Sequence, residues 1–187
     1  IGSTSRRLGN HRLVLGALRR DSLPVRRVLD VGCGSGELMR DIRRRLGVEV
    51  VGADLRPARV PGLQIVAADA VRDPLPACDV AVSVWMAHHL AETDLVELIR
   101  NVGRSARRLL LVDLVRHHVP LALFRTLAAP FLHPVNAADG MLSIRRAFTG
   151  VELRRAAARA LEGTEAAFRH TVAPLWLRQV LDVRYRR

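Results

Sequence analysis

The most informative absence in this chain of 187 residues is lysine, because all 30 of its basic residues are arginine. A Walker-type phosphate-binding loop needs a lysine after its last glycine, so the P-loop and kinase classes are excluded. Long apolar runs are also missing. The longest, such as Leu109–Val112 and Leu121–Phe124, are far shorter than the ~20 residues that span a bilayer, and we expect no membrane span.

Aromatic residues are scarce, at 4% of the chain, although positive charge is abundant. With 30 basic against 18 acidic residues, the formal net charge is +12. Such charge is typical of nucleic-acid-binding proteins. Here, however, the arginines are scattered as pairs along the whole chain and are not interleaved with aromatic residues. We favour a codon bias of a GC-rich genome as the cause, and a functional anion-binding surface is the alternative.

Cysteine is rare as well, with Cys33 and Cys78 in different segments of the chain. They form no Cys-x-x-Cys pair, and no histidine stands at ligand spacing from them. This pattern predicts a reduced, cytoplasmic protein without a structural metal. No signal-peptide pattern is evident. Cys33 is expected to be a small packed side chain rather than a nucleophile.

Short, continuous apolar runs predict strands that are covered on both faces, as in a parallel sheet. Helical periodicity falls between several of them, most clearly over Asp94–Val102 and Glu152–Leu161. Strand, helix and strand repeated in this way predict an α/β sheet with right-handed crossovers. The predicted strands are Arg27–Val31, Val48–Ala53, Leu63–Ala67, Val80–Val84 and Leu109–Val112.

The two ends of the chain complete the predicted domain, which we expect to be a single one over residues 1–187. Residues 8–20, with Leu8, Leu13, Leu15 and Leu18, predict an amphipathic leading helix. Thr149 and Glu152 have the spacing of a capping box at the start of the later helix. The final segments, Glu165–Thr171 and Leu175–Val183, predict an antiparallel strand pair joined by a turn at Ala173-Pro174.

The segment VLDVGCGSGELM joins the first predicted strand to the helix that follows it. A strand that ends in a glycine-rich turn and enters a helix brings its backbone very close to a ligand. After Asp30, the glycines Gly32, Gly34 and Gly36 run G-x-G-x-G, whereas the dinucleotide-binding fingerprint is G-x-G-x-x-G. This spacing disfavours a nicotinamide oxidoreductase.

The same segment resembles motif I of the class I S-adenosylmethionine-dependent methyltransferases of small-molecule type. Three later segments resemble the next motifs of that family, in order: VVGADLRP, VAADAVRDPLP and CDVAVSVWMAHHL. The resemblance covers roughly residues 25–115. It implies a Rossmann-like class I methyltransferase fold, with a mostly parallel seven-stranded sheet and an antiparallel edge hairpin. It also implies S-adenosylmethionine as the cofactor and S-adenosylhomocysteine as the product.

Roles in cofactor binding follow from the resemblance residue by residue. Asp54 stands where the family's acid at the end of strand two holds both ribose hydroxyls, and Asp69 stands where an acid accepts from the adenine amino group. The alternatives are that Asp30 and Asp69 only hold turns and that Asp54 only caps a helix. The implied cofactor-binding residues are Asp30, Gly32, Gly34, Gly36, Asp54, Leu55, Asp69, Ala70 and Ser83.

Histidines follow the predicted fourth and fifth strands, at the edge of the sheet where this family meets its acceptor. His88 and His89 are candidate catalytic bases, because histidine titrates near neutral pH. The alternative is that one of them caps a helix or packs structurally while the other faces solvent. His117 and His118 could line the acceptor pocket. No metal site is expected from these residues, because no carboxylate stands at clear ligand spacing.

The segment Ser83–Met86 bears on the acceptor, because it lacks the Asn/Asp-Pro-Pro-aromatic motif of enzymes that methylate adenine, cytosine or glutamine nitrogen. This departure favours oxygen or carbon acceptors on small molecules. Residues 116–148 are apolar in their first half and interrupted by Pro120, Pro130 and Pro134. They predict a lid or acceptor region built from short helices. The alternative is an ordinary packed insertion.

The later part of that region, DGMLSIRRAFTGVEL, resembles bacterial methyltransferases associated with polyketide-derived phenols and quinones, including the ubiquinone/menaquinone-like group. Asp139, Arg145 and Arg146 could bind a phenolic acceptor there or remain surface charges. The sequence thus predicts methyl transfer from S-adenosylmethionine to an oxygen or carbon of a small hydrophobic aromatic or polyketide/quinone-like acceptor. An RNA-modifying methyltransferase and a non-catalytic binding module with the same fold are the alternatives.

Overall fold

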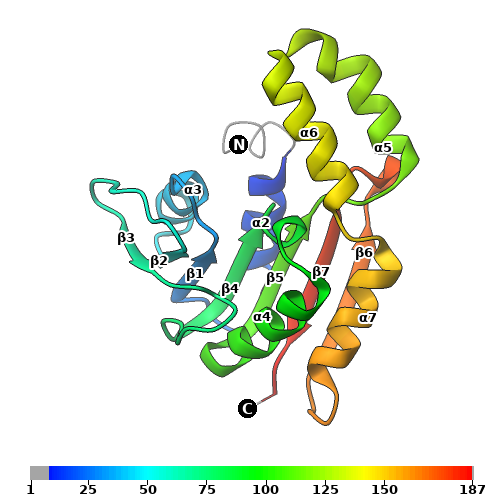
Figure 1. Ribbon diagram of the computed structural model, residues 1–187. Helices are drawn as coiled ribbons and strands as arrows, with labels where there is room; N and C mark the ends of the chain where they lie inside the picture. Colours follow the sequence, from blue (N-terminus) through cyan, green and yellow to red (C-terminus); the bar gives the residue numbers. More distant parts are fainter. Residues whose placement is uncertain (1–8, 187) are drawn as a thin grey trace.

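The computed structural model describes residues 9–186, in which seven strands form a single sheet with helices on both faces (Figure 1). The strand order is β3-β2-β1-β4-β5-β7-β6. Strands β1 to β5 pair in parallel, and β7 is antiparallel to both β5 and β6. The predicted Rossmann-like methyltransferase fold is confirmed. The strands are β1 (Arg27–Val31), β2 (Glu49–Asp54), β3 (Gln64–Ala67), β4 (Cys78–Val84), β5 (Ala106–Asp113), β6 (Ala167–Val172) and β7 (Gln179–Arg184).

Both faces of the sheet are covered, which explains why its strands read as continuous apolar runs. One core cluster packs α4 (Glu92–Ser105) and α7 (Gly150–Leu161) on one face, and another packs α2 (Asn10–Arg19) and α3 (Glu37–Leu46) on the other. Successive β5 residues alternate between these clusters: Leu109 belongs to the first and Leu110 to the second. A strand with two buried faces has no position that favours a polar side chain.

The leading helix and the capping box both occur. Helix α2 begins at Asn10, and the predicted residue Leu8 lies outside the described part of the chain. At α7, the Oγ1 of Thr149 accepts from the backbone N–H of Glu152 at 3.2 Å, and Oε2 of Glu152 accepts from that of Thr149 at 2.8 Å. No helix within residues 9–186 combines the length and apolar character that crossing a membrane requires.

The region between β5 and α7 consists of short helical segments that stand beyond the edge of the sheet at which β4 and β5 end (Figure 1). Two of its prolines lie at or near the starts of helical segments. Pro134 is the first residue of the longest helix of this region, and Pro130 lies in a 3₁₀ turn. We call residues 116–148 the lid segment. Its elements are α5 (His118–Leu123), the π-helical η2 (Phe124–Ala128), η3 (Ala129–Phe131) and α6 (Pro134–Arg146).

The predicted strand over Leu175–Val183 is wrong in its first half. A 3₁₀ turn, η4 (Pro174–Trp176), occupies that part, and β7 begins only at Gln179. Leu175 and Trp176 have φ values of 59° and 52°, in the left-handed region. Pro174 cannot donate a backbone hydrogen bond to a ladder, so the chain turns here despite the apolar side chains that follow.

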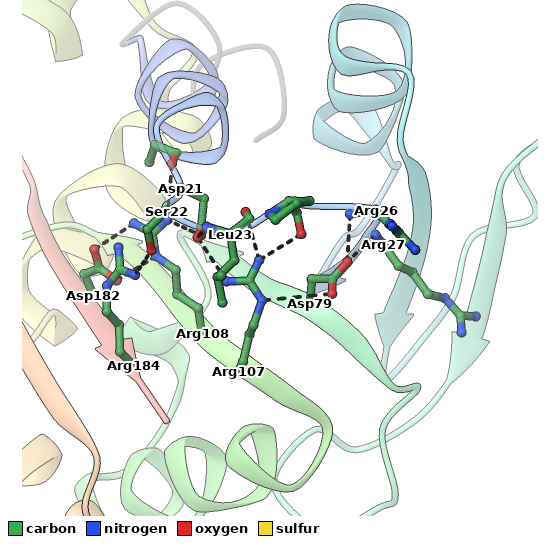
Figure 2. A network of polar contacts seen from close by, with 12 residues as sticks. Asp21, Ser22, Leu23, Arg26, Arg27, Asp79, Arg107, Arg108, Asp182 and Arg184 are labelled. Carbon is green, nitrogen blue, oxygen red and sulfur yellow. Dashed lines mark hydrogen bonds and ion pairs between the residues drawn. The ribbon is translucent and has the colours of Figure 1, made fainter. Parts of the chain in front are cut away.

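Strand β5 begins at Ala106, earlier than predicted, because two arginines in it are neutralised by ion pairs (Figure 2). Arg108 is only 5% exposed. Its guanidinium donates to both carboxylate oxygens of Asp182 on β7 at 2.8 and 2.7 Å, and to Asp21 at 2.8 Å. Arg107 donates to the other oxygen of Asp21 at 3.0 Å. Burial alone would raise the pKa of Asp21, but the bonds from Arg108 and Arg107 hold it below its ordinary value.

Candidate active site

The glycine-rich loop between β1 and α3 has a left-handed backbone conformation that glycine adopts without strain. Gly32, Gly34 and Gly36 have φ values of 72°, 51° and 69°. A Cβ at Gly32 would lie 2.6 Å from Cγ of Met86, whereas a Cβ at Gly34 would meet no heavy atom within 4 Å. The loop is therefore packed tightly at Gly32 and faces open space at Gly34.

That open space belongs to a pocket of about 680 Å³ at the carboxyl ends of β1, β2 and β4. Its volume is in the range typical of small-molecule sites, and its place is the one at which open α/β sheets bind ligands. Gly36, Ser83 and His88 are not among the lining residues. The predicted site residues that do line it are Asp30, Gly32, Gly34, Asp54, Leu55, Asp69, Ala70 and His89.

Asp54 ends β2, and two backbone amides hold its carboxylate in place. Oδ2 accepts from the N–H of Gly34 at 2.8 Å, and Oδ1 accepts from the N–H of Arg56 at 2.9 Å. A carboxylate has about four acceptor sites, so each oxygen can accept one bond more. Two neighbouring hydroxyl groups of a ribose fit that capacity.

Asp69 lines the pocket and also holds the turn that follows β3. Oδ1 accepts from the N–H of Val71 at 2.9 Å, and Oδ2 accepts from the guanidinium of Arg72 at 2.7 Å. These two hydrogen bonds hold the pKa of Asp69 below its ordinary value. The carboxylate is therefore a charged acceptor at the pocket wall, and its turn-forming role is compatible with ligand binding.

Asp30 lies on β1 below the loop and is only 3% exposed, yet it lines the pocket. Burial, and secondarily the charge of Asp54, raises the pKa of Asp30 to about 7. Burial likewise raises the pKa of Cys33 to about 12, with further contributions from both acids. The Cys33 thiol therefore stays protonated at neutral pH, and a thiol is a poor nucleophile.

The two adjacent histidines occupy a short 3₁₀ turn, η1 (Ala87–His89), with their ring centroids 4.1 Å apart. His88 is 6% exposed and is held by Asp113, the last residue of β5. Nδ1 of His88 lies 2.7 Å from Oδ1 of Asp113, and the backbone N–H of His88 donates to Oδ2 at 2.8 Å. Asp113 thus positions the whole turn.

His89 faces the pocket while His88 lies behind it. Burial lowers the pKa of His89 below its ordinary value, and the neighbouring His88 adds to the effect. The His89 ring is therefore neutral at pH 7 and can accept a proton. Helix α6 of the lid contacts η1, and His89 is an exposed residue of the pocket wall.

His117 and His118 do not line this pocket. Nδ1 of His117 accepts from the N–H of Val119 at 3.2 Å and so caps α5, and the ring stacks on Trp176 with centroids 4.1 Å apart. Trp85 does line the pocket and has a φ of 58°. Within residues 9–186, its Nε1 and the hydroxyl of the buried Ser83 have no hydrogen-bond partner.

Two further residues of the site were not singled out from the sequence. Asp113 could have been noticed, because it ends an apolar strand just as Asp54 does. His11 lines the pocket from α2, where the sequence predicted only an amphipathic helix. No group of three or more His, Cys, Asp or Glu side chains in the described part of the chain is placed to hold a metal ion.

Comparison with known proteins agrees with this geometry. Residues 28–108 match a family model described as a methyltransferase domain. The matched segment runs from β1 into β5 and contains the glycine-rich loop together with Asp54 and Asp69. No curated protein matches the sequence.

Solved structures of methyltransferases share the fold of this chain at low sequence identity. The plantazolicin methyltransferase BpumL in complex with S-adenosylhomocysteine has a TM-score of 0.74 at 12% identity, with 97% of this chain and 84% of that chain covered. Human N-acetylserotonin methyltransferase in complex with S-adenosylmethionine has a TM-score of 0.61 at 15% identity, covering 94% and 51%. The pyocyanin biosynthetic protein PhzM has a TM-score of 0.62 at 17% identity, with 91% of this chain and 53% of that chain covered.

Proposed function

We propose that this methyltransferase transfers a methyl group to an oxygen or carbon of a small hydrophobic acceptor of the aromatic or polyketide/quinone-like class. The observation that carries the proposal is that the glycine loop, Asp54, Asp69 and His89 all line one pocket. Three of these are groups that bind a nucleoside, and the fourth is a proton acceptor at the end nearest the lid.

The residues of the pocket fit S-adenosylmethionine without any phosphate-binding group. Gly34 leaves open space for close approach of the ligand, Asp54 would accept from the ribose hydroxyls, and Asp69 with Ala70 would contact the adenine. The buried Asp30 would be favoured as a carboxylate by a nearby positive charge. When bound, the cofactor supplies a methyl group on a positively charged sulfur.

His89 is the base that the geometry favours for an acceptor hydroxyl or an acidic carbon. The acceptor atom would form its bond to the methyl carbon as the bond from that carbon to sulfur breaks. The acceptor proton would pass to the neutral imidazole of His89, and the sulfonium would become a thioether. His88 and Asp113 would hold η1 in place behind it, and the adjacent ring of His88 is the second candidate base.

The composition of the lid segment favours an apolar acceptor. The segment does not line the pocket described above, but it exposes several apolar side chains, among them Phe131, which is 86% exposed, and Leu127 and Val135. Polar groups of α6, Asp139 and Arg146, lie close enough to His89 to influence its pKa. Methyltransferases with this fold that are named for small molecules, plantazolicin and N-acetylserotonin, lend further support.

The proposal is tested in two steps. Calorimetry should first show binding of S-adenosylhomocysteine by the purified protein. A panel of phenols, quinols and hydroxylated polyketides is then incubated with S-adenosylmethionine, and formation of S-adenosylhomocysteine is followed by mass spectrometry. We expect turnover with at least one apolar aromatic acceptor. Cofactor binding without turnover on any acceptor pool would instead identify a non-catalytic binding module.

A further inference from the structure

The pocket wall contains a buried histidine to which the proposed function gives no role. His11 is 5% exposed but lines the pocket from α2. Its Nδ1 lies 2.8 Å from Oδ2 of Asp41 on α3, and the other oxygen of Asp41 accepts from Arg44 at 2.9 Å. With Nδ1 engaged by Asp41, Nε2 is the ring nitrogen left to reach the pocket. The ring is thus held in one orientation by a carboxylate that is itself buried.

The pocket wall is rich in acidic side chains and poor in groups that could bind the carboxylate of the cofactor. Its wall carries the carboxylates of Asp30, Glu37, Asp54 and Asp69, and the chain contains no lysine. Of the residues that the structure describes, no arginine lines the pocket. The wall therefore suits the ammonium group, the sulfonium, the ribose hydroxyls and the adenine amine of S-adenosylmethionine. Among the side chains that line the pocket, only the histidines His11 and His89 can carry a positive charge toward the carboxylate of the ligand.

His11 is also at the correct end of the pocket. Asp54 and Asp69 follow β2 and β3, so the adenosine would lie toward that side of the sheet and the amino-acid end toward β1 and β4. Helix α2 covers this second side. Its Val14 and Leu18 belong to the same core cluster as Val28 of β1 and Val82 of β4. The other pocket histidine, His89, belongs to the acceptor side near the lid.

We propose that His11, held by Asp41, binds the carboxylate of S-adenosylmethionine and thereby selects ligands that carry the complete amino-acid group. Asp41 fixes the ring from the Nδ1 side, and Nε2 would donate to the carboxylate of the ligand. This inference rests on the proposed function, because it assumes that the cofactor occupies the pocket with its adenosine at Asp54 and Asp69.

The test compares two ligands that differ only in the carboxylate: S-adenosylhomocysteine and its decarboxylated analogue. Dissociation constants are measured by calorimetry at one fixed pH for the unmodified protein and for His11→Phe. A charge-assisted hydrogen bond predicts that His11→Phe weakens S-adenosylhomocysteine binding by about tenfold or more. Binding of the decarboxylated analogue should change less than about twofold by the same reasoning.

Matched variants separate this role from a structural one. His11→Gln keeps a donor near Nε2 and should recover part of the preference for the carboxylate. Asp41→Asn should reduce the preference, because it removes the charge that orients the ring. Arg12→Ala removes a positive charge from the exposed neighbour on the same helix and should leave both affinities unchanged.

Two outcomes would overturn the proposal while leaving the methyltransferase function standing. One is an equal loss of affinity for both ligands in His11→Phe, which would indicate damage to the pocket as a whole. The other is an unchanged affinity for both ligands in His11→Phe, which would show that the ring does not contact the carboxylate. Failure of the unmodified protein to bind either ligand would overturn this inference and the proposed function together.

Discussion

At the scale of single residues, the site depends on carboxylates whose orientation is set by the backbone around them. Asp54 is held by the amides of Gly34 and Arg56, and Asp113 by the amide and ring of His88. Preorganised groups bind a ligand without having to reorganise first, so removing one should be felt directly in affinity or rate.

Asp54→Ala should weaken the binding of S-adenosylhomocysteine by at least about tenfold, because it removes charge-assisted hydrogen bonds worth ~1.5–3 kcal/mol each. Calorimetry provides the measurement. Glu162→Ala is a suitable control, since Glu162 is an exposed acid at the end of α7 and does not line the pocket. An unchanged affinity in Asp54→Ala would contradict its role at the ribose.

If His89 is the catalytic base, its protonation determines how the rate depends on pH. The base must be neutral to accept a proton, and burial lowers the pKa of His89 below its ordinary value. Activity should therefore hold at neutral pH and fall only below about pH 6.5, the ordinary histidine value. The measurement is kcat/KM between pH 5 and 8. His89→Gln should lose about 10²–10⁴-fold in rate along with this acid limb. If His89→Gln shows the same loss of kcat/KM at acidic pH as the unmodified protein, another residue is the base, and His88 is the next to test.

At the scale of elements, the lid segment is tied to the sheet at its two ends by one buried side chain. Nε2 of Gln179, at the start of β7, donates to the carbonyl oxygens of Leu114 at 2.9 Å and of Phe148 at 2.7 Å. Leu114 lies just before the lid segment, and Phe148 is its last residue. Arg116 and Glu152 form an ion pair at the same neck. Hydrogen bonds and an ion pair therefore join both ends of the lid segment to the rest of the domain.

Gln179→Leu should loosen that base, because it leaves two buried carbonyl groups without a donor at about 1–3 kcal/mol each. Hydrogen–deuterium exchange should rise within residues 118–146 and stay unchanged in α4. The free energy of unfolding should fall by on the order of 2 kcal/mol. The exposed Gln64 offers the matched variant Gln64→Leu. Equal exchange changes throughout the protein would show that Gln179 only supports the fold.

At the scale of the whole molecule, the network around Arg108 joins the segment before β1 to strands β5 and β7 (Figure 2). Arg108→Met would leave the carboxylates of Asp21 and Asp182 without their main partner, and the Asp21 side chain is fully buried. Breaking a buried pair in this way should cost about 3–5 kcal/mol of stability. Urea unfolding provides the measurement. Arg184→Met, at the exposed end of β7, should cost less than about 1 kcal/mol, and an equal cost in both variants would contradict the assignment.

The net charge of +12 also belongs to this scale. Several of the arginines are engaged in ion pairs within the protein, including Arg72, Arg100 and Arg107. We therefore expect only weak, non-specific retention of RNA. In a filter-binding assay, retention should show little dependence on salt between low and moderate concentrations. A steep loss of retention with salt would indicate many phosphate contacts and favour an RNA substrate.

The sequence by itself determined the strand-helix alternation, the glycine loop and the acids at the ends of β2 and β3. These features depend on local chemistry: continuous apolar runs, glycine at positive φ, and carboxylates placed directly after strands. The sequence did not show that Arg107 and Arg108 belong to β5, because an isolated charge ends an apolar run. Asp21 and Asp182, distant in sequence, make those arginines compatible with a buried strand.

Tertiary structure alone decided which polar groups share the pocket. His11 reaches it from a helix near the start of the described chain, and only the packing of α2 against α3 brings it beside Asp41. The two adjacent histidines look equivalent in sequence. Asp113 binds one of them from another strand and leaves the other at the pocket wall. Contacts between residues far apart along the chain are absent from any local pattern, and they are what distinguishes these side chains.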